Sequence, residues 1–179
     1  MKKYLKKLPK DLQDLISLAG ELAYSNNMSA FLVGGFVRDL ILGVKNLDLD
    51  IVVEGDGIKF AEILSQQLNV GLIRHKRFGT ATIILKKYLK VDPSTSLRVN
   101  GERSRTIDIA TARQECYPQP AHLPEVTHGL LRDDLMRRDF SINAMAVSIN
   151  RQDFGRFIDC FDGRGDLTHK KIRILHNLS

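Results

Sequence analysis

Two aspartates, Asp48 and Asp50, lie within an apolar run, residues 47–53, and one residue separates them. Because successive side chains of a β-strand point to opposite faces, this spacing puts both carboxylates on one face, about 6 to 7 Å apart. Like charges at this distance repel, and a divalent ion such as Mg²⁺, which prefers oxygen ligands, would relieve the repulsion and could also bind a substrate phosphate. The alternative is a polar strand edge that faces solvent. A calcium-binding EF-hand loop is excluded, since it would need Gly at Val53 and Glu at Lys59.

A second short apolar run, residues 30–33, stops at Gly34 and Gly35, and a helical pattern that ends at Gly43 follows it. This order predicts a strand, a glycine turn and a helix. The backbone N–H groups at such a helix start, with Arg38 one turn further on, form a ready site for phosphate, although a glycine pair can also serve only as a turn. The chain has neither a GxGxxG fingerprint nor a GxxxxGK[ST] loop, which disfavours Rossmann and P-loop folds.

A third candidate acid, Asp108, lies between two isoleucines in another strand-like run, residues 106–111. Three acids carried by strands can share two metal ions, one lowering the pKa of an attacking hydroxyl and the other binding the leaving pyrophosphate. This arrangement suits nucleotidyl transfer.

A basic pair, Arg137 and Arg138, comes directly before Asp139, which could cap a helix that carries Asn143 one turn further on. Taken as structure alone, this segment is a helix start with a salt bridge.

The rest of the chain shows patterns that are less directly linked to chemistry. Three prolines make residues 113–129 look irregular, and the polar residues 86–104 predict a mobile loop. Helices are predicted at residues 12–23, after a cap at Asp56, and over most of residues 130–149 with a break near Asp139. A further strand is predicted at residues 79–85, and a short strand and a turn are expected after residue 156.

Charge and composition limit the class of protein. A chain of 179 residues that is 43% hydrophobic and 27% charged can bury a core as one domain with appendages, and its net charge of +6 favours an anionic partner such as nucleic acid or nucleotides. The longest uncharged stretch, residues 22–37, is too short and too polar for a membrane span. The N-terminal lysines are not followed by an apolar segment, so a cytoplasmic location is expected.

Four segments in order, FLVGGFVRDLILG, NLDLDIVVEGD, RTIDIATARQE and DDLMRRDFSINAMAV, closely resemble the head domain of class II tRNA nucleotidyltransferases and bacterial poly(A) polymerases. The resemblance covers roughly residues 28–176. It implies an α/β (α+β) fold with a polymerase-β-like nucleotidyltransferase palm, in which helices back a small mixed sheet. It also implies Mg²⁺-dependent addition of nucleotides from ATP or CTP to a tRNA or other RNA 3′ end, without a template.

Residue roles follow from the matching motifs. The resemblance implies that Asp48 and Asp50, with Asp108 as a third acid, are catalytic and ligate two metal ions. The implied contacts with phosphates, ribose and triphosphate involve Gly34, Gly35, Arg38, Arg137, Arg138, Asp139 and Asn143, of which Asp139 and Asn143 would position Arg138 and the sugar.

The resemblance also implies a domain organisation. Residues 1–25 are expected to form an N-terminal amphipathic helix, residues 26–150 the catalytic palm, and residues 151–179 the end of the head. In the family, a neck motif that reads the base and helical domains that hold tRNA come next, and this chain ends before any such motif, as expected for an excised or truncated head. A poly(A) polymerase head and a non-catalytic RNA-binding fragment remain alternatives, and the oligomeric state is open.

Overall fold

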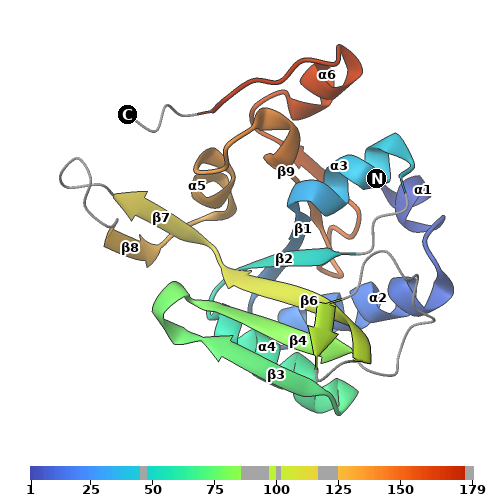
Figure 1. The fold of residues 1–179 in the computed structure, drawn as a ribbon, viewed down its shortest axis with the longest axis vertical. Helices are drawn as coiled ribbons and strands as arrows, with labels where there is room; N and C mark the ends of the chain where they lie inside the picture. The colour runs from blue at the N-terminus through green and yellow to red at the C-terminus, as the bar shows by residue number, and fades with distance from the viewer. Residues whose placement is uncertain (45–47, 86–96, 100–101, 117–124, 176–179) are drawn as a thin grey trace.

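A mixed β-sheet organises the fold of the computed structural model, which describes residues 1–44, 48–85, 97–99, 102–116 and 125–175 (Figure 1). Its strands follow the order β10-β9-β1-β2-β6-β4-β3, with β5 also pairing to β6. The pairing of β2 with β6 is parallel, and the other pairs are antiparallel. The strands are β1 Ser29–Val33, β2 Leu49–Glu54, β3 Gly71–His75, β4 Thr80–Leu85, β5 Leu97–Val99, β6 Glu102–Thr111, β7 Arg113–Cys116, β8 Glu125–His128, β9 Met145–Ser148 and β10 Phe157–Asp159.

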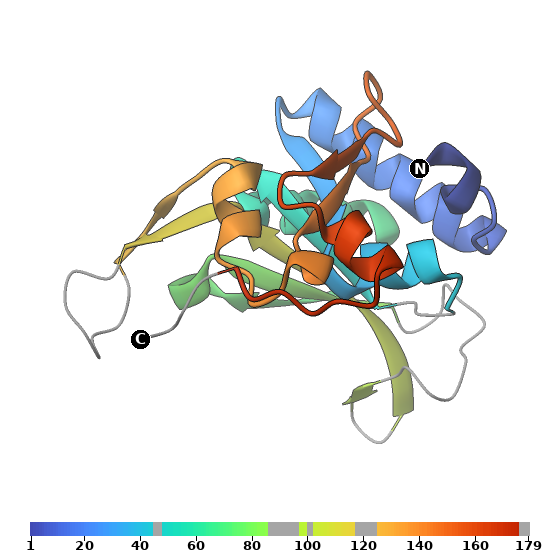
Figure 2. The ribbon, with the colours of Figure 1, turned by 90° about the horizontal axis from the view of Figure 1, so that it is seen from above.

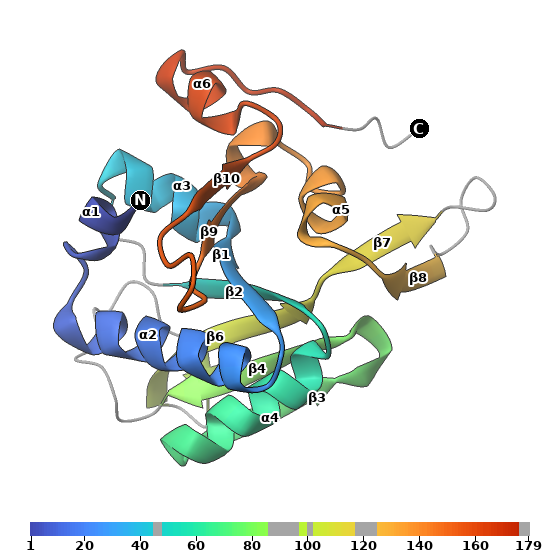
Figure 3. The same cartoon turned by 180° about the vertical axis from the view of Figure 1, so that it is seen from behind.

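Helices cover both faces of this sheet. The α-helices are α1 Lys2–Leu5, α2 Lys10–Ser25, α3 Gly34–Leu42, α4 Gly57–Leu68, α5 Leu131–Met136 and α6 Gly163–Thr168, and the 3-10 turns are η1 Lys76–Phe78 and η2 Ser141–Asn143. Figure 3 shows α2 and α4 lying across one face, with α5 at the opposite side of β1 and β2. The mixed sheet with its backing helices confirms the predicted fold class.

Two apolar clusters form the core, one on each face of the sheet. The larger cluster joins α2, α3 and α4 to strand residues such as Leu32 and Ile51. The smaller cluster joins Phe31 and Val52 to Leu131 and Leu135 of α5. Because neighbouring residues of a strand alternate between faces, Asp50 shares the α5 face with Val52.

Most predicted elements near the site are present. The strand, glycine turn and helix appear as β1 and α3, and Gly43 ends α3 in the left-handed conformation. The predicted cap of α4 is confirmed, since the Asp56 carboxylate accepts a hydrogen bond from the Lys59 backbone N–H at 2.9 Å.

Three predictions of local structure were wrong. Residues 145–148 form the buried strand β9 instead of a helix, because a short and mostly apolar run does not distinguish a helix from a strand. Residues 113–129 were expected to be irregular, but their two ends pair as strands β7 and β8, and the three prolines lie in the sequence between these strands. The turn after Asp139 is a 3-10 turn whose N-cap is Phe140, so Asp139 does not cap it.

Other predictions fall partly outside the described residues. The predicted mobile loop, residues 86–104, includes residues 86–96 and 100–101, which the structure does not describe, while β5 and the start of β6 occupy the rest. Strand β3 had not been predicted. Within the described ranges, no helix has the length and apolar character needed to cross a membrane. The division of the chain at residues 25 and 150 stays a prediction.

Candidate active site

Three polar side chains form a row across neighbouring strands on the α5 face of the sheet. In the ladder registers, Asp50 of β2 pairs with Asp108 of β6, and Asp108 pairs with Thr82 of β4. Residues paired in this way point to the same face, so the two carboxylates lie side by side. The Thr82 hydroxyl donates a 2.7 Å hydrogen bond to Asp108 Oδ1. A cleft of about 240 Å³ opens over this row and is also lined by Arg138.

The electrostatics of the row are those of an anionic pair. Burial, together with the charges of Asp108 and Asp48, raises the pKa of Asp50 to about 6, and Arg138 acts in the opposite direction. In the absence of a bound cation, the surroundings of Asp50 therefore favour its protonated form more than water does.

The donor set fits a hard divalent cation, because Asp50 and Asp108 offer carboxylate oxygens at one point. Asp48 is exposed and lies directly before β2. It precedes Asp50 by two residues, which is the spacing of side chains on the same face of a strand. Across the residues that the structure describes, no three or more His, Cys, Asp or Glu side chains gather as a metal-ligand group. The structure therefore brings Asp50 and Asp108 together and leaves Asp48 at the margin.

The start of α3 lies against this row. Gly34 has φ = +71°, and a Cβ atom there would lie 2.9 Å from Arg138 Nη1 and 3.2 Å from Asp50 Oδ2. Three groups that are far apart in the sequence thus meet at one point. Gly35 faces another arginine, since a Cβ on it would lie 3.5 Å from Arg38 Nη2.

Arg38 and Asn143 form a second contact between distant segments. Arg38 Nη1 donates to Asn143 Oδ1 at 2.8 Å, and Arg38 Nε donates to Asp39 Oδ1 at 2.8 Å. Asn143 therefore orients Arg38, whereas the motif comparison had suggested Arg138. The side chain of Asp139 is exposed, and its backbone carbonyl accepts a hydrogen bond from the Leu175 N–H.

One acid beside the site was not singled out from the sequence. Asp134 in α5 is fully buried and accepts hydrogen bonds from both Arg137 and Arg138. A signal was available, because an acid three and four residues before two arginines is placed to contact both on a helix.

A buried network supports η2, the turn that carries Asn143. Asp166 Oδ2 accepts hydrogen bonds from the Ser141 hydroxyl at 2.5 Å and from Arg173 Nε at 2.7 Å. Hydrogen bonds from Arg173 and then from Ser141 lower the pKa of the Asp166 carboxyl below its ordinary value of 3.8.

We expect Asp166→Asn to lower the urea midpoint of unfolding at neutral pH. A carboxyl whose pKa is lower in the folded state stabilises the fold above its unfolded pKa and loses that contribution as pH falls through the folded value. The difference between wild type and variant should therefore shrink as pH falls below 3.8, the ordinary pKa. Asp162→Asn is the control, because it also removes a carboxylate near Arg173, but Asp162 is exposed and its Oδ2 atom lies 3.8 Å from Arg173 Nη2. A difference that stays constant from pH 7 to pH 3 would contradict this prediction.

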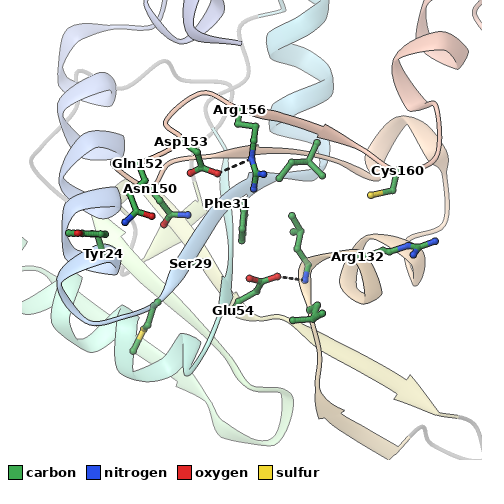
Figure 4. Close-up of a pocket in the computed structure, with 14 residues that line it drawn as sticks. Tyr24, Ser29, Phe31, Glu54, Arg132, Asn150, Gln152, Asp153, Arg156 and Cys160 are labelled. Atoms are coloured by element: carbon green, nitrogen blue, oxygen red, sulfur yellow. Dashed lines mark hydrogen bonds and ion pairs between the residues drawn. The ribbon is translucent and has the colours of Figure 1, made fainter.

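A larger cavity, about 490 Å³, lies on the same face beyond the first turn of α5 (Figure 4). Its charged groups are largely engaged with one another or with backbone: Arg156 pairs with Asp153 at 2.8 Å, and Glu54 Oε1 accepts from the Leu131 N–H at 2.7 Å. The smaller cleft is therefore the candidate site, because the carboxylates, an arginine and a helix start converge there.

Comparisons with known proteins show which family this chain is similar to. A family model described as the poly A polymerase head domain matches residues 30–173. The A-adding tRNA nucleotidyltransferase of Halalkalibacterium halodurans is 41% identical over 172 residues, which cover 96% of this chain and 36% of that protein.

Solved structures agree with this match. The Thermotoga maritima CCA-adding enzyme complexed with tRNA has a TM-score of 0.79 and 40% identity, covering 99% of this chain and 36% of that one. A complex of CCA-adding enzyme with ATP has a TM-score of 0.77 and 40% identity, covering 98% of this chain and 36% of that one. The chain thus spans little more than a third of the length of each of these three proteins.

Proposed function

The chain belongs to the poly(A) polymerase head-domain family, and from this we propose that it is the catalytic head of an enzyme adding nucleotides to tRNA 3′ ends. The proposed reaction is the A-adding or CCA-adding type, which the relatives' names support. The observation that carries it is the pair Asp50 and Asp108, side by side in register and facing Arg138 at the glycine turn. A cytosolic location, where tRNA is processed, is part of the proposal.

In this proposal, Asp48, Asp50 and Asp108 hold Mg²⁺ as a two-metal site. When bound, the ions would supply Lewis-acid activation of the RNA 3′-hydroxyl and neutralise charge on the leaving pyrophosphate. In the transfer, the RNA 3′-hydroxyl would lose its proton to water and its oxygen would form a bond to the α-phosphorus of the nucleotide. The bond from that phosphorus to the oxygen that bridges the α- and β-phosphates would break, so that pyrophosphate leaves.

The nucleotide would lie over the start of α3. In this proposal the N–H groups of Gly34 and Gly35 would face a phosphate, and guanidinium groups would bind phosphate oxygens with charge-assisted hydrogen bonds. The proposed contacts with phosphates and sugar come from Gly34, Gly35, Arg38, Arg137, Arg138, Asp139 and Asn143.

A non-catalytic RNA-binding fragment is disfavoured by one observation. Burial and neighbouring carboxylates raise the pKa of Asp50 to about 6, so keeping Asp50 charged beside Asp108 costs folding free energy. A protein that only bound RNA through basic side chains would gain nothing from this pair. A poly(A) polymerase head shares all these residues, and product length on tRNA and mRNA 3′ ends separates the two enzymes.

Grafting tests the proposed activity. In a chimera, this chain replaces the matching 172-residue segment of the Halalkalibacterium halodurans A-adding enzyme. We expect the chimera to extend a tRNA that ends in CC when given ATP and Mg²⁺. A chimera that folds and binds tRNA but transfers no nucleotide would contradict a catalytic head.

The isolated chain should bind ATP, CTP, GTP and UTP with similar affinity. The groups proposed to contact the nucleotide recognise phosphates and ribose, which all four nucleotides share. Calorimetric titration of the 179-residue chain in Mg²⁺ measures the four affinities. A preference of tenfold or more for one base, about 1.4 kcal/mol, would show instead that this chain itself reads the base.

A further inference from the structure

Asp134 divides its two carboxylate oxygens between two arginines. Oδ1 accepts from Arg137 Nε at 3.0 Å and from Arg137 Nη2 at 2.7 Å, and Oδ2 accepts from Arg138 Nη2 at 3.2 Å. Asp134 has no exposed surface, whereas the side chains of Arg137 and Arg138 are 26% and 20% exposed. A buried carboxylate thus fixes two cations that reach the surface beside the candidate site.

The other end of Arg138 points to the cleft. Its Nη1 atom would lie 2.9 Å from a Cβ placed on Gly34, in the same place where Asp50 Oδ2 approaches. Its Nε atom is buried and has no hydrogen-bond partner within the described ranges. A buried N–H without a partner costs folding free energy, so a fold is expected to keep one only where the conformation of that side chain matters.

A competing arrangement shows what Asp134 prevents. A long arginine next to two carboxylates would gain by pairing directly with Asp50 and Asp108, which would place its guanidinium where a metal ion is proposed. The bond from Nη2 to Asp134 Oδ2 restrains the guanidinium of Arg138. This bond joins Asp134 of α5 to Arg138, which lies four residues later in the chain and two residues past the end of the helix.

We propose that Asp134 is a positioning residue that holds Arg138, with Arg137, in the conformation that receives the phosphates of the incoming nucleotide. This inference rests on the proposed function. Asp134 itself touches no reacting atom, because it is fully buried beneath the arginines.

The test uses inorganic tripolyphosphate as the probe and the complete 179-residue chain, with affinities measured by calorimetry. Asp134→Asn keeps the shape of the side chain and removes the charge that holds both arginines. We expect it to weaken tripolyphosphate binding about tenfold, although the substitution makes the protein more positive. Added positive charge alone would strengthen anion binding, so a weaker affinity reports lost positioning.

Asp133→Asn is the matched control on the same helix, since Asp133 Oδ2 accepts only from the Leu130 N–H among the bonds found for its side chain. We expect it to change the affinity less than twofold. A double-mutant cycle of Asp134→Asn with Arg138→Ala shows whether the two residues act together. If Asp134 acts through Arg138, the double variant should bind at least threefold more tightly than the product of the two single losses predicts.

The outcomes separate the two proposals. Weaker binding in Asp134→Asn, with coupling to Arg138→Ala, supports the positioning role. Suppose that wild type binds tripolyphosphate and that Arg138→Ala weakens this binding. If Asp134→Asn does not weaken it, or if the loss of affinity in the double variant equals the product of the two single losses, the positioning role of Asp134 alone is overturned. If wild type, folded by circular dichroism, does not bind tripolyphosphate, the proposed phosphate site fails, and the role of Asp134 fails with it.

Discussion

Replacement of Asp50 by Asn is expected to lower nucleotidyl transfer by the chimera about 10³-fold or more, because a metal ligand supplies several kcal/mol of transition-state stabilisation. Asp50 is the carboxylate that lies closest to the centre of the candidate site. It faces Asp108 across the strand pair and approaches both Gly34 and the arginine above it. Affinity for tRNA should stay within about twofold, since that affinity comes from many separate Lys and Arg contacts with phosphates.

The measurement is the rate of addition of a radiolabelled nucleotide under single-turnover conditions. Glu54→Gln is the matched control, because Glu54 lies at the other end of the same strand, and the hydrogen bond found for it within the described residues comes from the Leu131 backbone N–H. The control should retain wild-type turnover. An Asp50→Asn chimera that kept a tenth of wild-type turnover would refute the proposed metal role of this carboxylate.

The same substitution should make the isolated chain more stable when EDTA removes metal ions. The pKa of Asp50 in the folded state, about 6, is above its ordinary value of 3.8, so the ionised carboxylate lowers stability as pH rises between these values. Above pH 7 the variant should therefore unfold at a higher urea concentration, and its free energy of unfolding should be higher by about 3 kcal/mol. The gain should vanish below pH 4. A loss of stability in Asp50→Asn would show that loss of transfer has a structural cause.

Alternation along a strand made part of this site predictable from sequence. Asp50 lies in an apolar run and Asp108 lies between apolar neighbours, so each could be placed on a strand and on a face. Asp48, which the same pattern placed on the strand, lies directly before β2. Their pairing partners could not be deduced, because strand order depends on contacts between segments distant in the chain. The parallel pairing of β2 with β6, which puts Asp50 beside Asp108, is seen only in the structure.

Short elements were the least predictable. Residues 145–148 are fully buried and, apart from Ser148, apolar, and their pairing with β1 and β10 makes them a strand. Seen from above, β9 lies inside the fold with helical turns on both sides (Figure 2). Asp134 was overlooked for a related reason. A charged residue in a helix is usually exposed, and its burial depends on how α5 packs on the sheet.

The glycine turn gives the second large expected effect. Gly34→Ala should weaken nucleotide binding by the isolated chain about tenfold and slow transfer by the chimera about 10²-fold, the scale that a misplacement near 1 Å can reach. Two causes act together. Alanine is disfavoured at φ = +71°, and its Cβ would lie 2.9 Å from Arg138 Nη1 and 3.2 Å from Asp50 Oδ2, so both side chains must move.

The adjacent glycine is the control for this prediction. At Gly35 the backbone has no positive φ, and a Cβ would lie 3.5 Å from Arg38 Nη2, an ordinary contact. Gly35→Ala should therefore leave the positions of the protein side chains unchanged. It should reduce nucleotide affinity no more than about threefold, and this loss would come from contact between the new methyl group and a bound phosphate. Thermal unfolding of both variants measures the strain, which for Gly34→Ala should be about 1–2 kcal/mol. Equal effects of the two substitutions on binding would show that Gly34, Asp50 and Arg138 do not form one site, because only the first glycine lies against the other two residues.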